Sequence, residues 1–235
     1  MSGEAIVLAG GLGTRLAPLV NDRPKSMAGV CGKPFLEYLL SYLEGQEVTR
    51  VILAVGYMSE AIRQYFGNHF RTLQLVYAHE QVPLGTGGAI LNALCKVQSD
   101  KVFILNGDTY FPVPLLKMDS FFNVHNPDLV IALRKVDDAS RYGLVLMNEG
   151  QKIIKFEEKN SAGKPGLING GIYLMRTNCL IDLGLPEKFS FETDFLKKYA
   201  GEKAFTGIEF RNYFVDIGIP ETYHQIRNDF PHQKG

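Results

Sequence analysis

Apolar residues in the first half of the chain alternate between short continuous runs and runs with helical spacing. Residues 5–9 are continuously apolar, which is typical of a strand buried on both faces of a parallel sheet. Residues 35–43 carry apolar side chains three and four positions apart, which predicts a helix that Pro34 is well placed to start. The same alternation predicts further strands at 51–55, 73–77 and 102–105, and further helices at 59–66, capped by Ser59, and at 86–95.

The second half of the chain is less regular. Two short strands, 144–147 and 152–156, flank Asn148-Glu149-Gly150, a turn sequence that predicts a β-hairpin. Further strands are expected at 129–133, 168–175 and 213–216, with helices at about 191–199 and from Pro220 onward.

The order of these elements predicts the fold class. A β-α-β-α-β order favours a doubly wound, mostly parallel sheet, so we expect an α/β, Rossmann-like fold. No repeats, linkers or low-complexity tracts interrupt the sequence, and residues 1–235 are expected to form one domain. Within it, residues 1–112 would form a parallel half and residues 113–235 a mixed half.

Composition narrows the choice of partners and compartment. Acidic and basic residues number 25 each, so no overall field would attract nucleic acid, and an anionic ligand needs a local cluster of charges. Cys31, Cys95 and Cys179 are far apart and odd in number, which favours reduced thiols in a cytoplasmic protein. The N-terminal residues have neither a basic region nor a long apolar one, so secretion and membrane insertion are not expected.

The most informative segment follows the first predicted strand. It reads Leu-Ala-Gly-Gly-Leu-Gly-Thr-Arg-Leu (residues 8–16), and its glycines let a backbone approach a phosphate chain closely. Leu16 stands where the dinucleotide fingerprint has its third glycine, and no Gly-Lys-Ser/Thr ends the segment as in a P-loop. Arg15 offers its planar guanidinium to phosphate oxygens. The predicted nucleotide-binding residues here are Leu8, Ala9, Gly10, Gly11, Gly13 and Thr14.

Two aspartates each follow a predicted strand. Asp108 ends Asn-Gly-Asp (residues 106–108), and Asp216 precedes Ile217-Gly218. An isolated aspartate in such a place is more commonly a turn or cap residue. Magnesium, however, prefers one or two carboxylates together with phosphate oxygens and water, so a pair of aspartates is a candidate site.

These motifs together resemble the sugar-1-phosphate nucleotidyltransferase family. The resemblance rests on Gly-Gly-x-Gly-Thr-Arg-Leu followed about ten residues later by Pro24-Lys25, and it extends along the chain to about Tyr223. It implies the nucleotide-diphospho-sugar transferase fold, with the second half binding sugar. It also implies that Arg15 and Lys25 are catalytic and grip the phosphates, and that Asp108 and Asp216 bind Mg²⁺.

The resemblance also assigns residues to the base and to the sugar phosphate. His-Glu-Gln-Val-Pro-Leu-Gly-Thr-Gly-Gly-Ala (residues 79–89) is similar to the family's base-reading loop. It implies that Glu80 and Gly85 read the base, with Thr86 beside them. Gly87 and Gly88 have an alternative role as a helix start packed closely on the sheet. On the sugar side the resemblance implies binding roles for Gly143, Glu158, Lys159 and Asn169.

The base is predicted from the chemistry of Glu80. Guanine presents two adjacent donors, and a carboxylate accepts both, which favours GTP; the neighbouring amide Gln81 would suit thymine or uracil instead. Within the family, stretches such as Gly-Leu-Ile-Asn-Gly-Gly-Ile-Tyr (residues 166–173) resemble the D-glycero-D-manno-heptose 1-phosphate guanylyltransferases. The implied substrates are a nucleoside triphosphate and a sugar 1-phosphate, for nucleotide-sugar and polysaccharide biosynthesis, and a homo-oligomer is compatible with this.

Several alternatives stay open at this point. The chain is also compatible with a mannose-1-phosphate guanylyltransferase, a uridylyltransferase or a thymidylyltransferase of the same family. A glycosyltransferase would also use metal-binding aspartates, but has no need of the Gly-Gly-x-Gly-Thr-Arg segment. A non-catalytic regulatory protein with this fold would be expected to have lost Arg15, Lys25 or an aspartate, and all are present.

Overall fold

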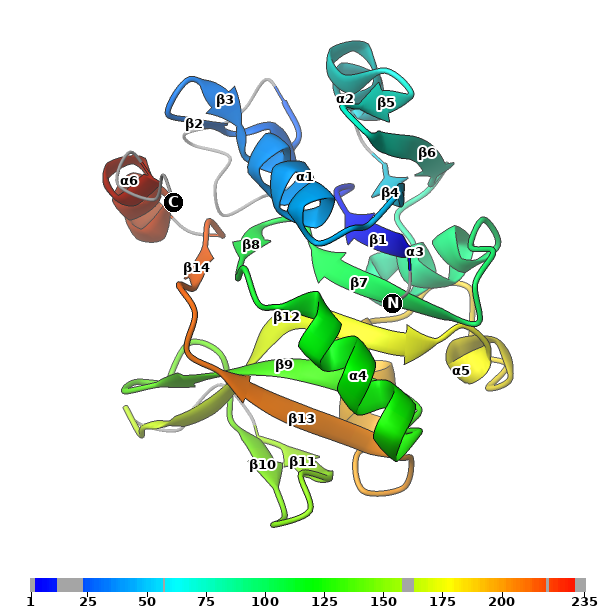
Figure 1. The fold of residues 1–235 in the computed structure, drawn as a ribbon, viewed down its shortest axis with the longest axis vertical. Coiled ribbons are helices and arrows are strands. Elements are labelled where there is room, and N and C mark those ends of the chain that lie inside the picture. Colours follow the sequence, from blue (N-terminus) through cyan, green and yellow to red (C-terminus); the bar gives the residue numbers. More distant parts are fainter. Residues whose placement is uncertain (1–2, 12–22, 57, 158–162, 219, 231–235) are drawn as a thin grey trace.

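The computed structural model describes residues 3–11, 23–56, 58–157, 163–218 and 220–230, shown in Figure 1. Its main feature is an eight-stranded sheet, made of β1 (Glu4–Leu8), β4 (Arg50–Val55), β5 (His69–Phe70), β6 (Leu73–His79), β7 (Lys101–Asn106), β9 (Leu129–Val136), β12 (Gly166–Arg176) and β13 (Phe205–Phe210). The strand order is β13-β9-β12-β7-β1-β4-β6-β5.

The first half of the chain forms the parallel part of this sheet. Strands β7, β1, β4 and β6 lie side by side and run in the same direction, and Ala5 of β1 is in register with Val51 and Phe103. Their residues are apolar because helices cover both faces of the sheet. The expected strands near 5–9, 51–55, 73–77 and 102–105 are therefore confirmed.

The second half extends the same sheet with mixed strand directions. Strand β12 is antiparallel to both β7 and β9, and β13 is parallel to β9. The sheet therefore runs without a break from the parallel half into the mixed half (Figure 1). This mixed α/β architecture with a mostly parallel centre agrees with the expected fold class.

Helices cover the two faces of the sheet as in a doubly wound fold. On the face shown in front in Figure 1, α1 buries Leu36, Leu39 and Leu40, whose spacing is the one that predicted a helix. The helices on this face are α1 (Phe35–Gly45), α2 (Ser59–Phe66), α4 (Leu115–His125) and α6 (Pro220–Asp229). The opposite face carries α3 (Gly85–Leu94), the short α5 (Asn178–Ile181) and η2 (Phe191–Lys197), a π-helix.

Short elements complete the described chain. The expected hairpin is formed by β10 (Val145–Met147) and β11 (Ile153–Phe156), which pair antiparallel. Two other two-stranded sheets join β8 (Thr109–Tyr110) to β14 (Val215–Asp216) and β2 (Gly29–Val30) to β3 (Lys33–Pro34). A 3₁₀ turn, η1, covers Lys25–Met27.

The structure corrects several expected boundaries. Ser59 does not cap α2: it is the first helical residue, and Met58 precedes it with a left-handed φ of 58° and no side-chain cap. Helix α3 begins at Gly85, one residue earlier than expected, and the last strand contains only Val215 and Asp216. Strand β13 was not predicted, because Gly207 interrupts the pattern of apolar residues. Glycine is needed there, since a Cβ would lie 2.4 Å from a methyl carbon of Leu133.

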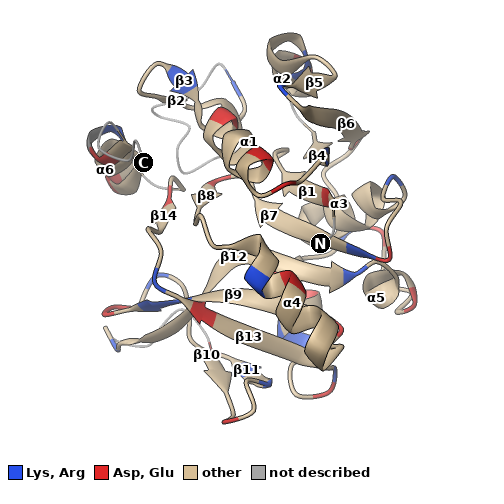
Figure 2. Ribbon diagram, viewed as in Figure 1, with Lys and Arg blue, Asp and Glu red and all other residues tan. Residues whose placement is uncertain are grey.

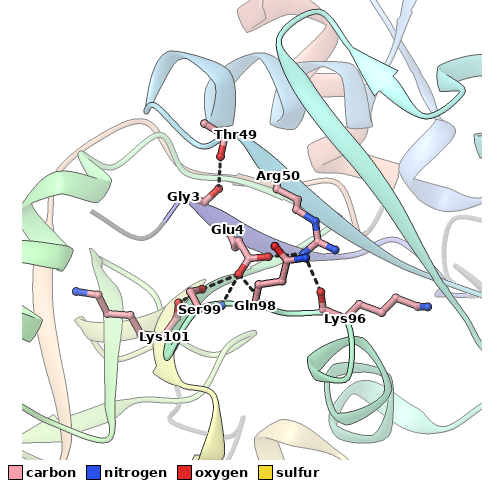
Figure 3. Close-up of polar contacts among 8 residues, drawn as sticks. All are labelled: Gly3, Glu4, Thr49, Arg50, Lys96, Gln98, Ser99 and Lys101. Carbon is pink, nitrogen blue, oxygen red and sulfur yellow. Dashed lines mark hydrogen bonds and ion pairs between the residues drawn. The ribbon is translucent and has the colours of Figure 1, made fainter.

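A buried polar cluster closes the amino-terminal edge of the parallel strands (Figure 3). Glu4 is only 7% exposed, and its Oε2 accepts hydrogen bonds from the backbone N–H of Gln98 (2.8 Å) and from the backbone N–H and hydroxyl of Ser99 (2.7 Å each). Its Oε1 accepts a hydrogen bond from Arg50, whose guanidinium also donates to the Lys96 carbonyl at 2.7 Å. Burial alone would raise the pKa of Glu4, but these donors hold it below its usual range.

Charged residues are mixed over both halves of the fold (Figure 2), in keeping with the balanced composition. Among the described residues, no helix combines the length and the apolar character needed to cross a membrane.

Candidate active site

A cavity of about 960 Å³ opens at the carboxyl ends of the parallel strands. Residues that follow β1, β4, β6 and β7 line one part of it, and residues of β12, the β10–β11 hairpin, η2 and β14 line the remainder. Parallel strands all end at the same edge of a sheet, and open α/β sheets bind their ligands at that edge. The volume is in the range of small-molecule binding sites.

Most of the residues predicted from the sequence lie together around this cavity, although they come from distant parts of the chain. Those that line it are Leu8, Ala9, Gly10, Gly11, Lys25, Glu80, Gly85, Thr86, Asp108, Gly143, Asn169 and Asp216. The other predicted residues, Gly13, Thr14, Arg15, Glu158 and Lys159, lie outside the described residues.

The glycines after β1 and β7 serve different purposes. A Cβ on Gly10 would lie 2.7 Å from the backbone nitrogen of Gly56, and one on Gly107 would lie 2.2 Å from the Leu8 carbonyl oxygen. Both glycines therefore allow neighbouring loops to pack against each other. Gly11, by contrast, has nothing within 4 Å of that position among the described residues, so its backbone is open to the cavity. Of Gly10 and Gly11, the two described glycines of this segment, only Gly11 leaves the space that a closely approaching phosphate would need.

Asp108 and Asp216 are brought together by a short antiparallel pairing. In it, Thr109 of β8 is in register with Asp216 of β14, and the backbone N–H of Ile217 donates to the Asp108 carbonyl at 2.9 Å. Asp216 Oδ1 accepts the backbone N–H of Gly218 at 2.6 Å. The two carboxylates that the sequence singled out separately therefore lie at one end of the cavity.

Lys25 reaches into the same cluster. Its Nζ lies 2.5 Å from Asp108 Oδ2, and its side chain is only 11% exposed while that of Asp108 is 35% exposed. A Cβ added to Gly218 would lie 3.1 Å from Lys25 Nζ and 2.7 Å from Asp216 Oδ1, so the ammonium group is also near the second carboxylate. The ammonium group of Lys25 is thus a cation that already lies between the two carboxylates, Asp108 and Asp216.

Glu80 lies at the opposite side of the glycine-rich segment. Its backbone N–H donates to the Val55 carbonyl at 2.8 Å, and its Oε2 accepts the backbone N–H of Leu84 at 3.0 Å. Its Oε1 would lie 3.3 Å from a Cβ on Gly10. Burial raises the pKa of the Glu80 carboxyl group, an effect that the Leu84 N–H opposes. The carboxylate is therefore half-buried, oriented by the backbone and exposed to the cavity.

The glycines at the start of α3 pack on a different partner from the one expected. Cβ atoms on Gly85, Gly87 and Gly88 would lie 2.5, 2.1 and 2.2 Å from atoms of Phe189 or Glu187. The close approach that Gly87 and Gly88 allow is therefore to the segment before η2, while α3 as a whole packs on β1, β4 and β6 of the sheet. Gly85 has a φ of +75°, which also favours glycine.

The part of the cavity that contains Asn169, where the sugar was expected, is built on an irregularity in β12. The β12–β9 register shifts between Asn169 and Tyr173, where Gly171 has a φ of +74°. Asn169 donates to the Tyr173 hydroxyl at 2.8 Å and accepts the backbone N–H of Gly171 at 3.0 Å, so its amide group has a fixed orientation. Gly143 also lines the cavity and has a left-handed φ of +76°.

Tyr142 stands beside the aspartate cluster. Burial and the negative charge of Asp216 raise the pKa of its hydroxyl, with a smaller contribution from Asp108. Tyr142 and the two aspartates line the same cavity, and the hydroxyl lies within reach of their charge.

Four cavity residues on η2 had no role in the sequence interpretation. Glu192, Thr193, Leu196 and Lys197 line the cavity, although only a helix was expected there. Their spacing, i, i+1, i+4 and i+5, places them on one helical face, and this is the signal that would have identified them.

Comparison with known proteins identifies a family and relatives that match nearly the whole chain. The model of a family described as "Nucleotidyl transferase" matches residues 4–233. The D-glycero-alpha-D-manno-heptose 1-phosphate guanylyltransferase of Campylobacter jejuni is 44% identical over 223 residues, covering 95% of this chain and 98% of that protein. The protein of the same name from Aneurinibacillus thermoaerophilus is 43% identical over 229 residues, covering 97% and 99%.

A solved structure is similar over the same length. The crystal structure of HddC from Yersinia pseudotuberculosis has a TM-score of 0.87 and 37% identity, covering 97% of this chain and 99% of that one. HddC complexed with GMP-PN is similar to the same extent, with a TM-score of 0.86.

Proposed function

The chain belongs to the nucleotidyl transferase family, and we propose that it transfers the guanylyl group of GTP to D-glycero-D-manno-heptose 1-phosphate, with release of pyrophosphate. One observation carries the proposal. Lys25, Asp108 and Asp216 share a cavity with the half-buried carboxylate of Glu80 and the oriented amide of Asn169. A nucleotide-sugar product needs these three kinds of group together: charges for phosphates, a reader for the base and a reader for the sugar.

The reaction is a single in-line displacement. An oxygen of the sugar phosphate forms a bond to the α-phosphorus of the triphosphate, and the bond from that phosphorus to the pyrophosphate oxygen breaks. The attacking phosphate is already ionised at neutral pH, so no general base has to remove a proton. Catalysis then depends on positioning the two substrates and on stabilising negative charge.

Three basic residues are proposed to provide this positioning. Arg15 and Lys25 grip the triphosphate and the attacking phosphate, and Lys159 binds the sugar phosphate. Lys25 has the supporting contact: its ammonium group is largely buried at the cavity wall, against Asp108. A buried ammonium group held in place needs little rearrangement to meet a phosphate, which is how preorganised charges accelerate such reactions.

Asp108 and Asp216 are proposed to hold Mg²⁺. The cluster fits a cation because the ammonium group of Lys25 already lies among these carboxylates. Among the described residues, no three histidine, cysteine, aspartate or glutamate side chains gather around one point. Two carboxylates suit magnesium, which takes its other ligands from phosphate oxygens and water. When bound, the ion would offset the charge of the phosphate groups.

Glu80 is proposed to read the guanine base, with the backbone of Gly85 and its neighbour Thr86 beside it. Guanine presents N1–H and the 2-amino group side by side, and a carboxylate accepts both hydrogen bonds. The orientation of Glu80 by the Leu84 N–H supports this role. Gln81 also lines the cavity, so reading by an amide, which would favour UTP or dTTP, is the competing proposal within the family.

The sugar 1-phosphate is proposed to lie between Gly143 and Asn169, with Glu158 completing its hydroxyl contacts. The relatives named above carry the heptose in their names, which supports heptose over mannose. Residues 1–235 are further proposed to act as one domain in the cytoplasm.

The experiment is a measurement of pyrophosphate release across a panel of triphosphates and sugar 1-phosphates. We expect the highest kcat/KM with GTP and the heptose 1-phosphate, and we expect Glu80→Gln to lose the preference for GTP by about tenfold. Gln81→Glu, at the adjacent position, is the matched control and should keep the preference. A wild-type preference for UTP or dTTP would overturn the guanylyl assignment, and no release with any pair would overturn the proposed function.

A further inference from the structure

The π-helix η2 forms a wall of the cavity without having a known part in the reaction. Glu192 and Thr193 face the cavity from its first turn, and Leu196 and Lys197 from its last. The helix packs against α3 on one side and β11 on the other. It therefore lies between the base loop and the sugar side, and π-helical turns are frequently found at functional sites.

Thr86 connects the base loop to this helix. Its hydroxyl accepts the backbone N–H of Phe191 at 2.9 Å and donates to Glu192 Oε2 at 2.8 Å. The same Glu192 oxygen also receives a hydrogen bond from the Ser190 hydroxyl at 3.3 Å. The Thr86 hydroxyl thus both accepts and donates a hydrogen bond, and both partners, Phe191 and Glu192, belong to η2. The one hydrogen of this hydroxyl is therefore donated to another residue of the protein.

The backbone reinforces the same junction. Phe189 donates its N–H to the Leu84 carbonyl at 3.0 Å, and Gly87 donates its N–H to the Phe189 carbonyl at 3.0 Å. Leu84 is also the residue whose N–H orients Glu80. The base reader and the start of η2 are therefore held by one set of hydrogen bonds.

The contacts continue from η2 to the sugar side. The ring of Phe191 meets that of Tyr173 edge to face, with centroids 5.1 Å apart. The Tyr173 hydroxyl accepts the hydrogen bond from Asn169 that orients this sugar-side amide. A displacement of η2 would therefore alter both the cavity face of Glu192 and the support of Asn169.

From these contacts we infer that Thr86 is a positioning residue: its hydroxyl holds Glu192 and η2 in place for the sugar 1-phosphate. This inference rests on the proposed function, and it gives Thr86 a role different from direct contact with the nucleotide. Glu192, with its carboxylate held at one oxygen and facing the cavity, is then a determinant of sugar binding. A shared network of this kind is established only by coupling between variants.

The test compares Thr86→Val, which keeps the shape and removes the hydroxyl, with Thr86→Ser, which keeps the hydroxyl. We expect Thr86→Val to raise the KM for the sugar 1-phosphate at least about fivefold, the effect of one lost hydrogen bond. The equilibrium Kd for GTP alone should stay within about twofold. Thr86→Ser should restore the KM. Thr206→Val is the matched control, because Thr206 also donates its hydroxyl, to the Leu129 carbonyl at 3.2 Å, but lies outside the cavity lining.

A double-variant cycle identifies Glu192 as the group that Thr86 acts through. In a Glu192→Ala background, Thr86→Val should raise the KM for the sugar 1-phosphate clearly less than in the wild type, because only the contact with the Phe191 N–H is then lost. The inference is overturned if Thr86→Val weakens GTP binding as much as it raises that KM, if it changes neither, or if its effect is undiminished without Glu192. Failure of the wild-type protein to release pyrophosphate from any substrate pair would overturn the proposed function instead.

Discussion

Glu4 and Asp108 each meet a cationic side chain at an end of the parallel strands, but at opposite ends. Glu4 begins β1 at the amino-terminal edge, where Arg50 and Ser99 surround it (Figure 3). Asp108 follows β7 at the carboxyl-terminal edge, where Lys25 is its partner. The two pairs have similar chemistry, so their different surroundings indicate what each pair does.

The surroundings differ in hydrogen bonding and in exposure. The Glu4 carboxylate accepts bonds from three backbone or side-chain donors besides Arg50, and it is almost fully buried. The Asp108 side chain is 35% exposed to a cavity and lies close to a second carboxylate, Asp216. An ion pair that is buried and fully hydrogen-bonded contributes to folding, whereas two carboxylates that share one ammonium group at an open cavity keep capacity for an external cation.

The largest expected effect is loss of activity at the open cluster. Asp108→Asn and Asp216→Asn should each lower magnesium-dependent turnover by about a thousandfold, because both carboxylates are proposed to hold the same ion. The free energy of unfolding should fall less for Asp108→Asn than for loss of Glu4, since Asp108 is 35% exposed and Lys25 keeps the Asp216 carboxylate nearby. Steady-state kinetics and urea denaturation measure the two quantities. A variant that keeps wild-type turnover at low magnesium would show that its residue is not a ligand.

The buried cluster should give the opposite result. Glu4→Gln leaves Arg50 without its charged partner and should lower the free energy of unfolding by about 3 kcal/mol. Turnover of the folded enzyme should not change, because Glu4 does not line the cavity. Urea denaturation tests this against Glu44→Gln, which breaks the exposed pair with Arg71 and should cost far less. Equal losses in the two variants would contradict the distinction between the clusters.

A smaller effect is expected when the cation of the open cluster is removed. Lys25→Met keeps the length of the side chain and should lower turnover by about a hundredfold, the typical loss for one charge that stabilises a transition state. The control is Lys33→Met, because Lys33 pairs with Glu37 on the surface at 2.7 Å and lies away from the cavity. Turnover of Lys25→Met equal to that of the control would remove Lys25 from the mechanism.

The smallest expected effect is a pH dependence of stability. The pKa of Glu4 is lowered in the folded protein, so its contribution is complete above the ordinary glutamate pKa of about 4.3 and is lost as the pH falls through the lower folded value. The stability difference between wild type and Glu4→Gln should therefore be constant above about pH 5 and shrink below about pH 4. Urea denaturation as a function of pH measures it. A difference that grows toward acid pH would contradict the lowered pKa.

Regular local patterns explain why much of the fold could be predicted. Strand β1 is buried inside the sheet and α1 buries one face against it. Burial requires apolar side chains, so both elements can be recognised from the spacing of apolar residues in the sequence. Boundaries were less predictable: Met58, just before α2, has a left-handed conformation that its residue type does not favour. Glu4 gave no signal at all, because a single acid at a strand start looks like any surface charge.

The sequence by itself determined the order of chemical groups along this chain: a glycine-rich segment with its arginine, Glu80 before a glycine-rich helix, and aspartates after two strands. Only the tertiary structure decided which of these groups meet. Pairing of β8 with β14 brings Asp216 to Asp108, and the packing of Phe189 on the α3 glycines brings Glu192 to Thr86. Local patterns record burial of neighbouring residues, whereas contacts between distant segments depend on the packing of the whole chain.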